Sequence, residues 1–219
     1  MFFRKKNISC ALKYEKIPLS TPIEHLNFIV FDTETTGFQV ANIDRIIEIG
    51  AVSVKGLEVC ELDTFQTYVN PRRNIPQETI GLTSISDDQV EGAPLALEAM
   101  MSFFDFVESR EPVCLVGHYV SFDVLALKSE FSREKIVLKK FLTIDTLDLI
   151  GFIAPSYDMR DLERYAMDFG TRIYNRHSGL GDALTTAYLF IELLCQFKKR
   201  GYSTWGELLN ATQSQIRSL

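Results

Sequence analysis

The hydrophobic pattern of the sequence changes period once, and this change restricts the fold more than any other feature. Three apolar, β-branched runs come first, at Phe28–Phe31, Ile46–Val54 and Val59–Val69. From Pro94 onward, apolar residues recur at helical spacing, and the helical segments alternate with short apolar strands. Strands that are followed by alternating helices and strands predict an α/β fold with a central mixed sheet flanked by helices.

Turn signals and local period place the separate elements. Lys55 and Gly56 form a tight turn between the second and third runs, which predicts an antiparallel hairpin. Ser121 is the expected N-cap of a helix after the strand that ends at Val116. The pattern predicts further strands at 113–116 and 142–145, a loop at 71–76, and helices at 94–109, 121–131, 147–152, 161–169 and 180–199.

Length and composition indicate one full-sized globular domain. The chain has 219 residues, of which 46% are hydrophobic and 24% charged. We expect this domain at residues 27–200, between a basic N-terminal arm (1–26) and a helical C-terminal tail (201–219). The arm contains apolar residues such as Leu12 and Ile17. Packing on the domain and a flexible, solvated arm are therefore both open.

Charge and cysteine usage exclude several classes of protein. The formal net charge of −6 argues against a basic coat protein that covers nucleic acid. The four cysteines form no CxxC pair, which predicts reduced thiols and no zinc knuckle. No secretory signal and no uncharged apolar run of membrane-spanning length is visible, so we expect a cytoplasmic protein without a membrane partner.

Two carboxylates follow the first predicted strand. Asp32 and Glu34 are two positions apart, so their side chains point to the same side of an extended strand. Two like charges this close are costly unless a cation lies between them, and Mg²⁺ prefers such oxygen ligands. The simpler alternative is that Asp32 caps a turn and Glu34 is solvated.

Acidic residues also open two of the predicted helices. Asp123 lies in the first turn of the helix after Gly117-His118, and Asp182 opens the long C-terminal helix, five residues after His177. Each carboxylate could simply compensate a helix dipole, and His177 could be a loop residue without a task. Those separate explanations do not account for the order and spacing of all the pieces together.

The complete set resembles the DEDDh exonucleases, the DnaQ-like group of the RNase H-like superfamily. The matching segments are Phe31 to Gly37, Gly117-His118 through Phe122-Asp123, and His177 followed by four residues and Asp182. The resemblance covers roughly residues 27–197. It implies an RNase H-like fold with a five-stranded mixed sheet, and the histidine places the chain in the histidine branch.

The resemblance also implies a mechanism with two divalent metal ions, Mg²⁺ or Mn²⁺. Asp32, Glu34, Asp123 and Asp182 would bind the metals, and His177 would accept the proton of the attacking water. His118 is the rival base, but its spacing to Asp123 better fits a structural hydrogen bond. The residues expected to contact the terminal nucleotide are Thr35, Thr36, Gly37, Leu82, Thr83 and Phe122, although core packing is the more frequent role of a phenylalanine.

The implied activity is removal of nucleotides from the 3′ end of single-stranded DNA, in proofreading or repair. An RNA-trimming 3′-to-5′ exoribonuclease of the same branch is the nearer alternative. The other alternative is a polymerase-associated, epsilon-like subunit that acts mainly as a binding partner. The sequence ends at Leu219 with no long extension and no clamp-binding peptide, which favours a stand-alone nuclease.

Overall fold

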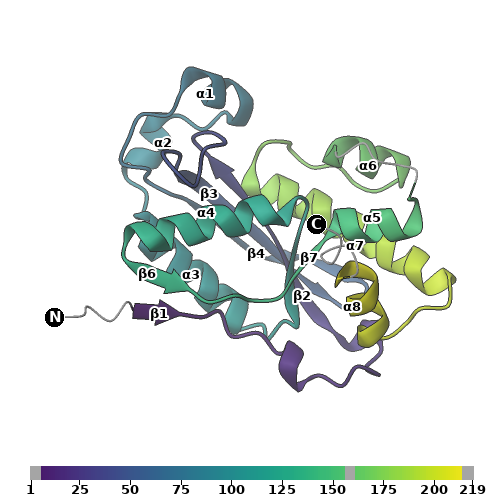
Figure 1. Cartoon of the computed structure of the whole chain (residues 1–219). Coiled ribbons are helices and arrows are strands. Elements are labelled where there is room, and N and C mark those ends of the chain that lie inside the picture. Colours follow the sequence, from purple (N-terminus) through teal and green to yellow (C-terminus); the bar gives the residue numbers. More distant parts are fainter. Residues whose placement is uncertain (1–5, 156–160, 214–219) are drawn as a thin grey trace.

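The computed structural model describes residues 6–155 and 161–213 and is built on one central sheet (Figure 1). Five strands lie in the order β4-β3-β2-β5-β7. Neighbours among β2, β3 and β4 are antiparallel, whereas β5 runs parallel to β2 and β7 runs parallel to β5. The mixed five-stranded sheet and the β3–β4 hairpin are therefore confirmed. The strand bounds are β2 (Asn27–Thr35), β3 (Ile46–Lys55), β4 (Glu58–Tyr68), β5 (Cys114–Gly117) and β7 (Thr143–Asp145).

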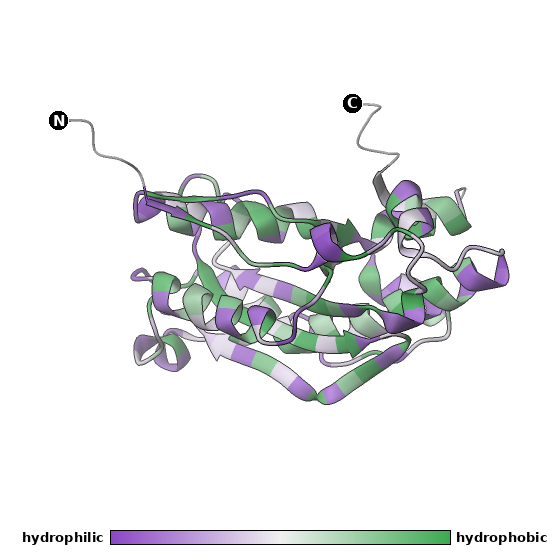
Figure 2. Ribbon diagram, turned by 90° about the horizontal axis from the view of Figure 1, so that it is seen from below, coloured by the Kyte–Doolittle hydropathy of each residue, from purple (hydrophilic) through white to green (hydrophobic). Residues whose placement is uncertain are grey.

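Side chains on β2 alternate between two hydrophobic cores. Phe28 and Val30 enter the first core, whereas Ile29 and Phe31 enter the second. Figure 2 shows hydrophobic residues concentrated along the strands and on the helices that cover them. The first core is closed by α5 (Thr146–Ile153), α6 (Leu162–Asp168), α7 (Gly179–Lys199) and α8 (Trp205–Gln213), and the second by α3 (Ala96–Glu108) and α4 (Val120–Arg133).

The long helix α7 belongs to the interior of the domain. Its length and apolar composition would suffice to cross a membrane, but 67% of its most apolar window is buried inside the protein. Phe190, Leu193 and Phe197 are fully buried in the first core. α7 is therefore a core helix, and its apolar character is explained by packing.

The N-terminal arm packs against the domain over residues 6–26. Its strand β1 (Lys6–Ile8) pairs in parallel with β6 (Ile136–Leu138), and the short 3-10 helices η1 (Tyr14–Lys16) and η2 (Ile23–His25) follow. Ile23 of the arm and Trp205 of α8 are buried in the same first core. Of the two alternatives for the arm, packing on the domain and a flexible, solvated arm, the structure shows packing over residues 6–26. The domain boundaries at residues 27 and 200 stay predictions.

The hydrophobic pattern of the sequence does not predict several of the shortest helices and strands. It does not reveal β1, β6, α1 (Gln77–Thr83) or α2 (Asp87–Glu91), because each is too short to display a period. The predicted N-cap of α4 at Ser121 is wrong. The helix begins at Val120, and its N-cap is Tyr119, which adopts a left-handed conformation with φ of 62°.

The N-terminus of α7 rests directly on the backbone of β3. A Cβ atom added to Gly50 would lie 2.1 Å from the carbonyl carbon of Gly179, the first residue of α7. A Cβ on Gly179 would in turn lie 3.0 Å from the backbone nitrogen of Gly50 and 3.4 Å from the carbonyl oxygen of Asp32. This contact, which only glycine permits, brings the start of α7 to the end of β2.

We therefore expect Gly50→Ala to displace the start of α7. Overpacking of this kind costs about 1–3 kcal/mol, which should appear as a fall of several degrees in Tm by calorimetry. Gly92→Ala is the matched control, because Gly92 has a φ of −89° and no atom within 4 Å of an added Cβ. Equal Tm values for the two variants would contradict this interpretation of the contact.

Candidate active site

Three carboxylates meet where β2 ends and α7 begins. Asp32 and Glu34 are even-numbered positions of β2, so they point to the same side of the sheet as Phe28 and Val30, the side covered by α7. Asp182 lies in the first turn of α7. Oxygen atoms of these three side chains lie within 4.8 Å of one another. The sheet period and the docking of α7 together produce this convergence.

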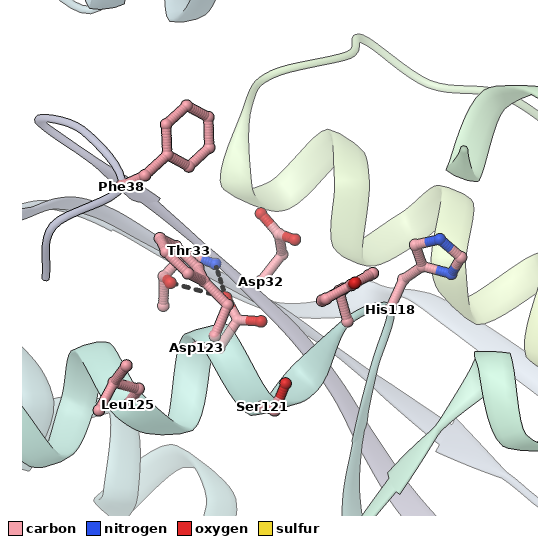
Figure 3. Close-up of a pocket in the computed structure, with 9 residues that line it drawn as sticks. Asp32, Thr33, Phe38, His118, Ser121, Asp123 and Leu125 are labelled. Carbon is pink, nitrogen blue, oxygen red and sulfur yellow. Dashed lines mark hydrogen bonds between the residues drawn. The ribbon is translucent and has the colours of Figure 1, made fainter. Parts of the chain in front are cut away.

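Asp123 approaches from the other side of the sheet. β5 pairs with β2 only as far as Val30, so the edge of β2 beyond that residue is open to the start of α4. Asp123 Oδ1 accepts hydrogen bonds from the backbone nitrogen of Thr33 at 2.9 Å and from its hydroxyl at 2.6 Å. Figure 3 shows Asp123 on α4 beside Asp32 on β2, with the Thr33 bonds dashed.

The carboxylates of this cluster raise one another's pKa. Burial, followed by the charges of Asp123, Asp182 and Glu34, raises the pKa of Asp32 well above its usual value. Burial is also the main cause that raises the pKa of Glu34 to about 8 and that of Asp123 to about 7. The opposing charge comes from Arg176, whose guanidinium forms an ion pair with Asp182.

This electrostatic state fits a divalent metal ion. Four carboxylates, two buried and two half-buried, carry more negative charge than the single guanidinium of Arg176 neutralises. Hard cations such as Mg²⁺ and Mn²⁺ bind oxygen ligands of this type. Asp32, Glu34 and Asp182 are the residues placed to hold an ion, and Asp123 stands next to them.

His177 lies at the rim of a cleft over the carboxylates. The cleft has a volume of about 240 Å³. The backbone of His177 is left-handed, with φ of 57°, and its nitrogen donates to Asp182 Oδ2 at 3.2 Å. Of the residues predicted from the sequence, Asp32, Glu34, Thr35, Gly37, Leu82, Thr83, Phe122, His177 and Asp182 line this cleft.

Thr36 is the predicted contact residue that does not line the cleft. It is buried, and its hydroxyl donates to Asp44 Oδ1 at 2.8 Å. Thr83 is also buried, with its hydroxyl bonded to the Thr79 carbonyl. Leu82, by contrast, is 49% exposed, and Phe122 contacts the ring of the exposed Phe38 at a centroid distance of 6.2 Å.

The rival base, His118, has a structural partner. Its Nδ1 lies 2.7 Å from the hydroxyl of Thr146, the first residue of α5. The hydrogen-bond partner of Asp123 is Thr33 instead. His118 therefore ties the end of β5 to the start of α5.

Two further residues of the site were not identified from the sequence. Glu48 is buried near the start of β3, where its Oε2 accepts from the backbone nitrogen of Gly179 at 2.8 Å and its Oε1 accepts from Gln66 Nε2 at 2.6 Å. A charged residue within the apolar run Ile46–Val54 was the available signal. Arg176 was detectable only as the neighbour of His177.

We expect Glu48 to position the start of α7. In Glu48→Ala the Gly179 nitrogen would be buried without an acceptor, which costs about 1–3 kcal/mol. The measurement is the rise in Tm on adding Mn²⁺. This rise should be smaller in Glu48→Ala, because the start of α7 would no longer hold Asp182 and His177 beside the carboxylates of β2.

The conservative variant separates this role from simple folding. Glu48→Gln keeps an acceptor for Gly179 and, with the Gln66 amide reversed, a partner for Gln66, so it should retain the response to Mn²⁺. The exposed Glu91→Ala is the matched control. An unchanged response in Glu48→Ala would contradict a positioning role.

The raised carboxyl pKa values predict how stability depends on pH without metal. Between about pH 4.5 and 8 the folded protein holds protons at Glu34 and Asp123 that the unfolded chain has released, so the free energy of unfolding falls as pH rises. We expect Tm in EDTA to be several degrees lower at pH 8 than at pH 5. Asp32→Asn should flatten this profile, and a flat wild-type profile would contradict the prediction.

Comparison with known proteins identifies the family. The exonuclease family model RNase_T matches residues 29–190. The DNA polymerase III PolC-type protein of Caldanaerobacter subterraneus subsp. tengcongensis is 34% identical over 186 residues, which cover 83% of this chain and 12% of that protein. A DNA polymerase III subunit epsilon-like protein of Rhodobacter capsulatus is 34% identical over 203 residues, covering 90% of this chain and 28% of that protein. The chain thus spans a small part of these relatives.

Solved structures share the fold at lower identity. Exonuclease X in complex with 5′-overhanging duplex DNA has a TM-score of 0.63 and 20% identity, covering 84% of this chain and 99% of that one. The nuclease domain of 3′hExo, a DEDDh family member bound to rAMP, has a TM-score of 0.68 and 19% identity, covering 83% and 96%. The RNase H-like fold is confirmed. The family model extends from β2 into α7, the two elements that bring the carboxylates together, so this chain belongs to the exonuclease family and carries the DEDDh motifs.

Proposed function

We propose that this protein is a metal-dependent 3′-to-5′ exonuclease that removes nucleotides from the 3′ end of single-stranded DNA. The observation that carries the proposal is the convergence of Asp32, Glu34 and Asp182 within 4.8 Å, under a cleft that His177 lines. Relatives named as DNA polymerase III proteins, at 34% identity, favour DNA as the substrate.

The residues divide the chemistry between them. Asp32, Glu34, Asp123 and Asp182 would hold two divalent ions, which supply positive charge to the phosphate and acidify the attacking water. His177 takes the proton of that water as its oxygen attacks phosphorus. The bond from phosphorus to the 3′ oxygen of the preceding nucleotide breaks, and that oxygen takes a proton from solvent. A nucleoside 5′-monophosphate is released, and the shortened strand keeps a 3′-hydroxyl.

The cleft supplies the contacts for the terminal nucleotide. Gly37 and Thr35 present backbone at the end of β2, and the Thr35 hydroxyl donates to the Gly37 carbonyl at 2.7 Å, which fixes this turn. Leu82 on α1 and Phe122 on α4 offer apolar surface to the base or the sugar. Stacking and apolar contact tolerate any base, as an exonuclease requires.

RNA remains the second candidate substrate, because the nuclease domain of 3′hExo, which shares the fold, is bound to rAMP. A matched pair of DNA and RNA oligonucleotides, labelled at either end, separates the two and also reports polarity. Faster loss of a 3′ label from DNA supports the proposal. Faster degradation of RNA would replace DNA with RNA as the substrate.

A polymerase partner is a separate proposal that the names of the relatives motivate. Co-purification of the tagged chain with a polymerase from its own cells would support it. Recovery of the chain alone as an active nuclease would favour a stand-alone enzyme.

We expect substitutions in the cluster to remove hydrolysis in two distinguishable ways. His177→Ala should lower kcat by about 10²–10⁴-fold, the usual contribution of a general base, while Mn²⁺ still raises Tm. Asp182→Asn should lower both kcat and the Tm response, because it removes a metal ligand. The exposed His25→Ala and Asp88→Asn are the matched controls. Full activity of Asp182→Asn would refute the proposed site.

A further inference from the structure

A second cleft continues from the active site along α4, and the proposed terminal-nucleotide contacts do not use it. We name it the α4 cleft; it has a volume of about 510 Å³, and Ser121, Leu125, Lys128, Lys140, Asp145 and Asp148 are among its lining residues. Ser121 and Leu125 also line the cavity that contains Asp32 and Asp123. The two cavities therefore share a wall.

The shared wall is one exposed face of α4. Ser121, Leu125 and Lys128 are four and three residues apart, so they lie on the same side of the helix, and all three are exposed. Figure 3 shows Ser121 and Leu125 on either side of Asp123. Lys128 follows Asp123 by five residues, a rise of about 7.5 Å along the helix. That rise corresponds to roughly two stacked nucleotides.

Two lysines and two aspartates are the charged residues that line the α4 cleft. Lys128 and Lys140 line the α4 cleft, and Lys135 and Lys139 lie between them in the sequence. None of these four lysines forms an ion pair within residues 6–155 and 161–213. Lys128 also lines a further hollow with Ser132 and Arg133, which extends the face away from the site.

The two acidic residues of the α4 cleft differ in whether backbone groups already bind their carboxylate oxygens. Both oxygens of Asp145 accept backbone hydrogen bonds, Oδ1 from Tyr119 and Leu147 and Oδ2 from Val120. The side chain of Asp148 forms no hydrogen bond or ion pair within the described ranges, and burial raises its pKa to about 6. Asp148 is therefore the carboxylate that opposes an anion in the cleft near neutral pH.

We propose that the α4 cleft binds the phosphate backbone of a single-stranded nucleic acid upstream of the nucleotide in the active site, with Lys128 and Lys140 as its cationic contacts. This inference rests on the proposed function. A molecule with a net charge of −6 and an acidic site needs local positive charge to retain a polyanion, and this cleft offers it next to the site.

Length dependence of binding tests the proposal. The probes are a fluorescent dinucleotide and an octanucleotide of the same 3′ sequence, each with a phosphorothioate at the terminal linkage to resist hydrolysis. Anisotropy in Mg²⁺ gives the Kd of each. The wild type should bind the octanucleotide more tightly than the dinucleotide, and we call the ratio of the two Kd values the gap between the probes. Lys128→Ala/Lys140→Ala should reduce this ratio by roughly tenfold. The slope of log Kd against log salt should fall by about 1.4, or 0.7 for each lost phosphate contact.

Two further variants test whether the charge of the α4 cleft controls length-dependent binding, and in which direction. Asp148→Asn removes the opposing charge, so it should widen the gap between the two probes by about twofold to threefold. Lys55→Ala/Lys199→Ala makes the same charge change at the ends of β3 and α7 remote from the site and should leave the gap as in the wild type. Equal effects of the two double variants would overturn the proposal.

The result also separates this inference from the proposed function. A wild type that degrades 3′ ends but binds both probes equally would refute the α4 cleft and leave the exonuclease intact. A wild type that neither binds nor degrades oligonucleotides would refute both.

Discussion

The close contact between Gly50 of β3 and Gly179 of α7 is the constraint on which the site depends. Because neither residue has a side chain, the start of α7 lies against the sheet backbone instead of one side-chain layer above it. Glu48 completes the contact by accepting a hydrogen bond from Gly179. Asp182, in the first turn of α7, is thereby carried to the carboxylates of β2.

The cluster formed in this way is electrostatically unfavourable without a counter-ion. Burial and mutual repulsion raise the carboxyl pKa values, and the single ion pair between Arg176 and Asp182 offsets only part of the charge. The protein accepts this cost at one end of a sheet whose two faces are otherwise covered by well-packed apolar cores. Such a concentration of perturbed groups is typical of a functional site.

The exposed face of α4 connects the carboxylate cluster with the substrate binding that we propose. Asp123 lies in the first turn of α4, beside the other carboxylates of the cluster, and the exposed side of the helix carries Leu125 and then Lys128. The acidic groups of the proposed reaction and the basic groups that we propose for the polyanion are thus separated along one helix. This separation makes the net charge of −6 compatible with the nucleic-acid substrate that we propose.

The sequence alone determined the order of long strands and helices and the carboxylates of the motifs, because these depend on local period and on residue type. It could not assign Glu48 or Lys128 to the site region, nor predict short elements such as α1, which carries the predicted contact residue Leu82 to the cleft. Those positions depend on contacts between segments far apart in the chain. The tertiary structure decided that Asp32 and Glu34 face α7 while Asp123 reaches them around the open edge of β2, because strand pairing and helix docking are non-local.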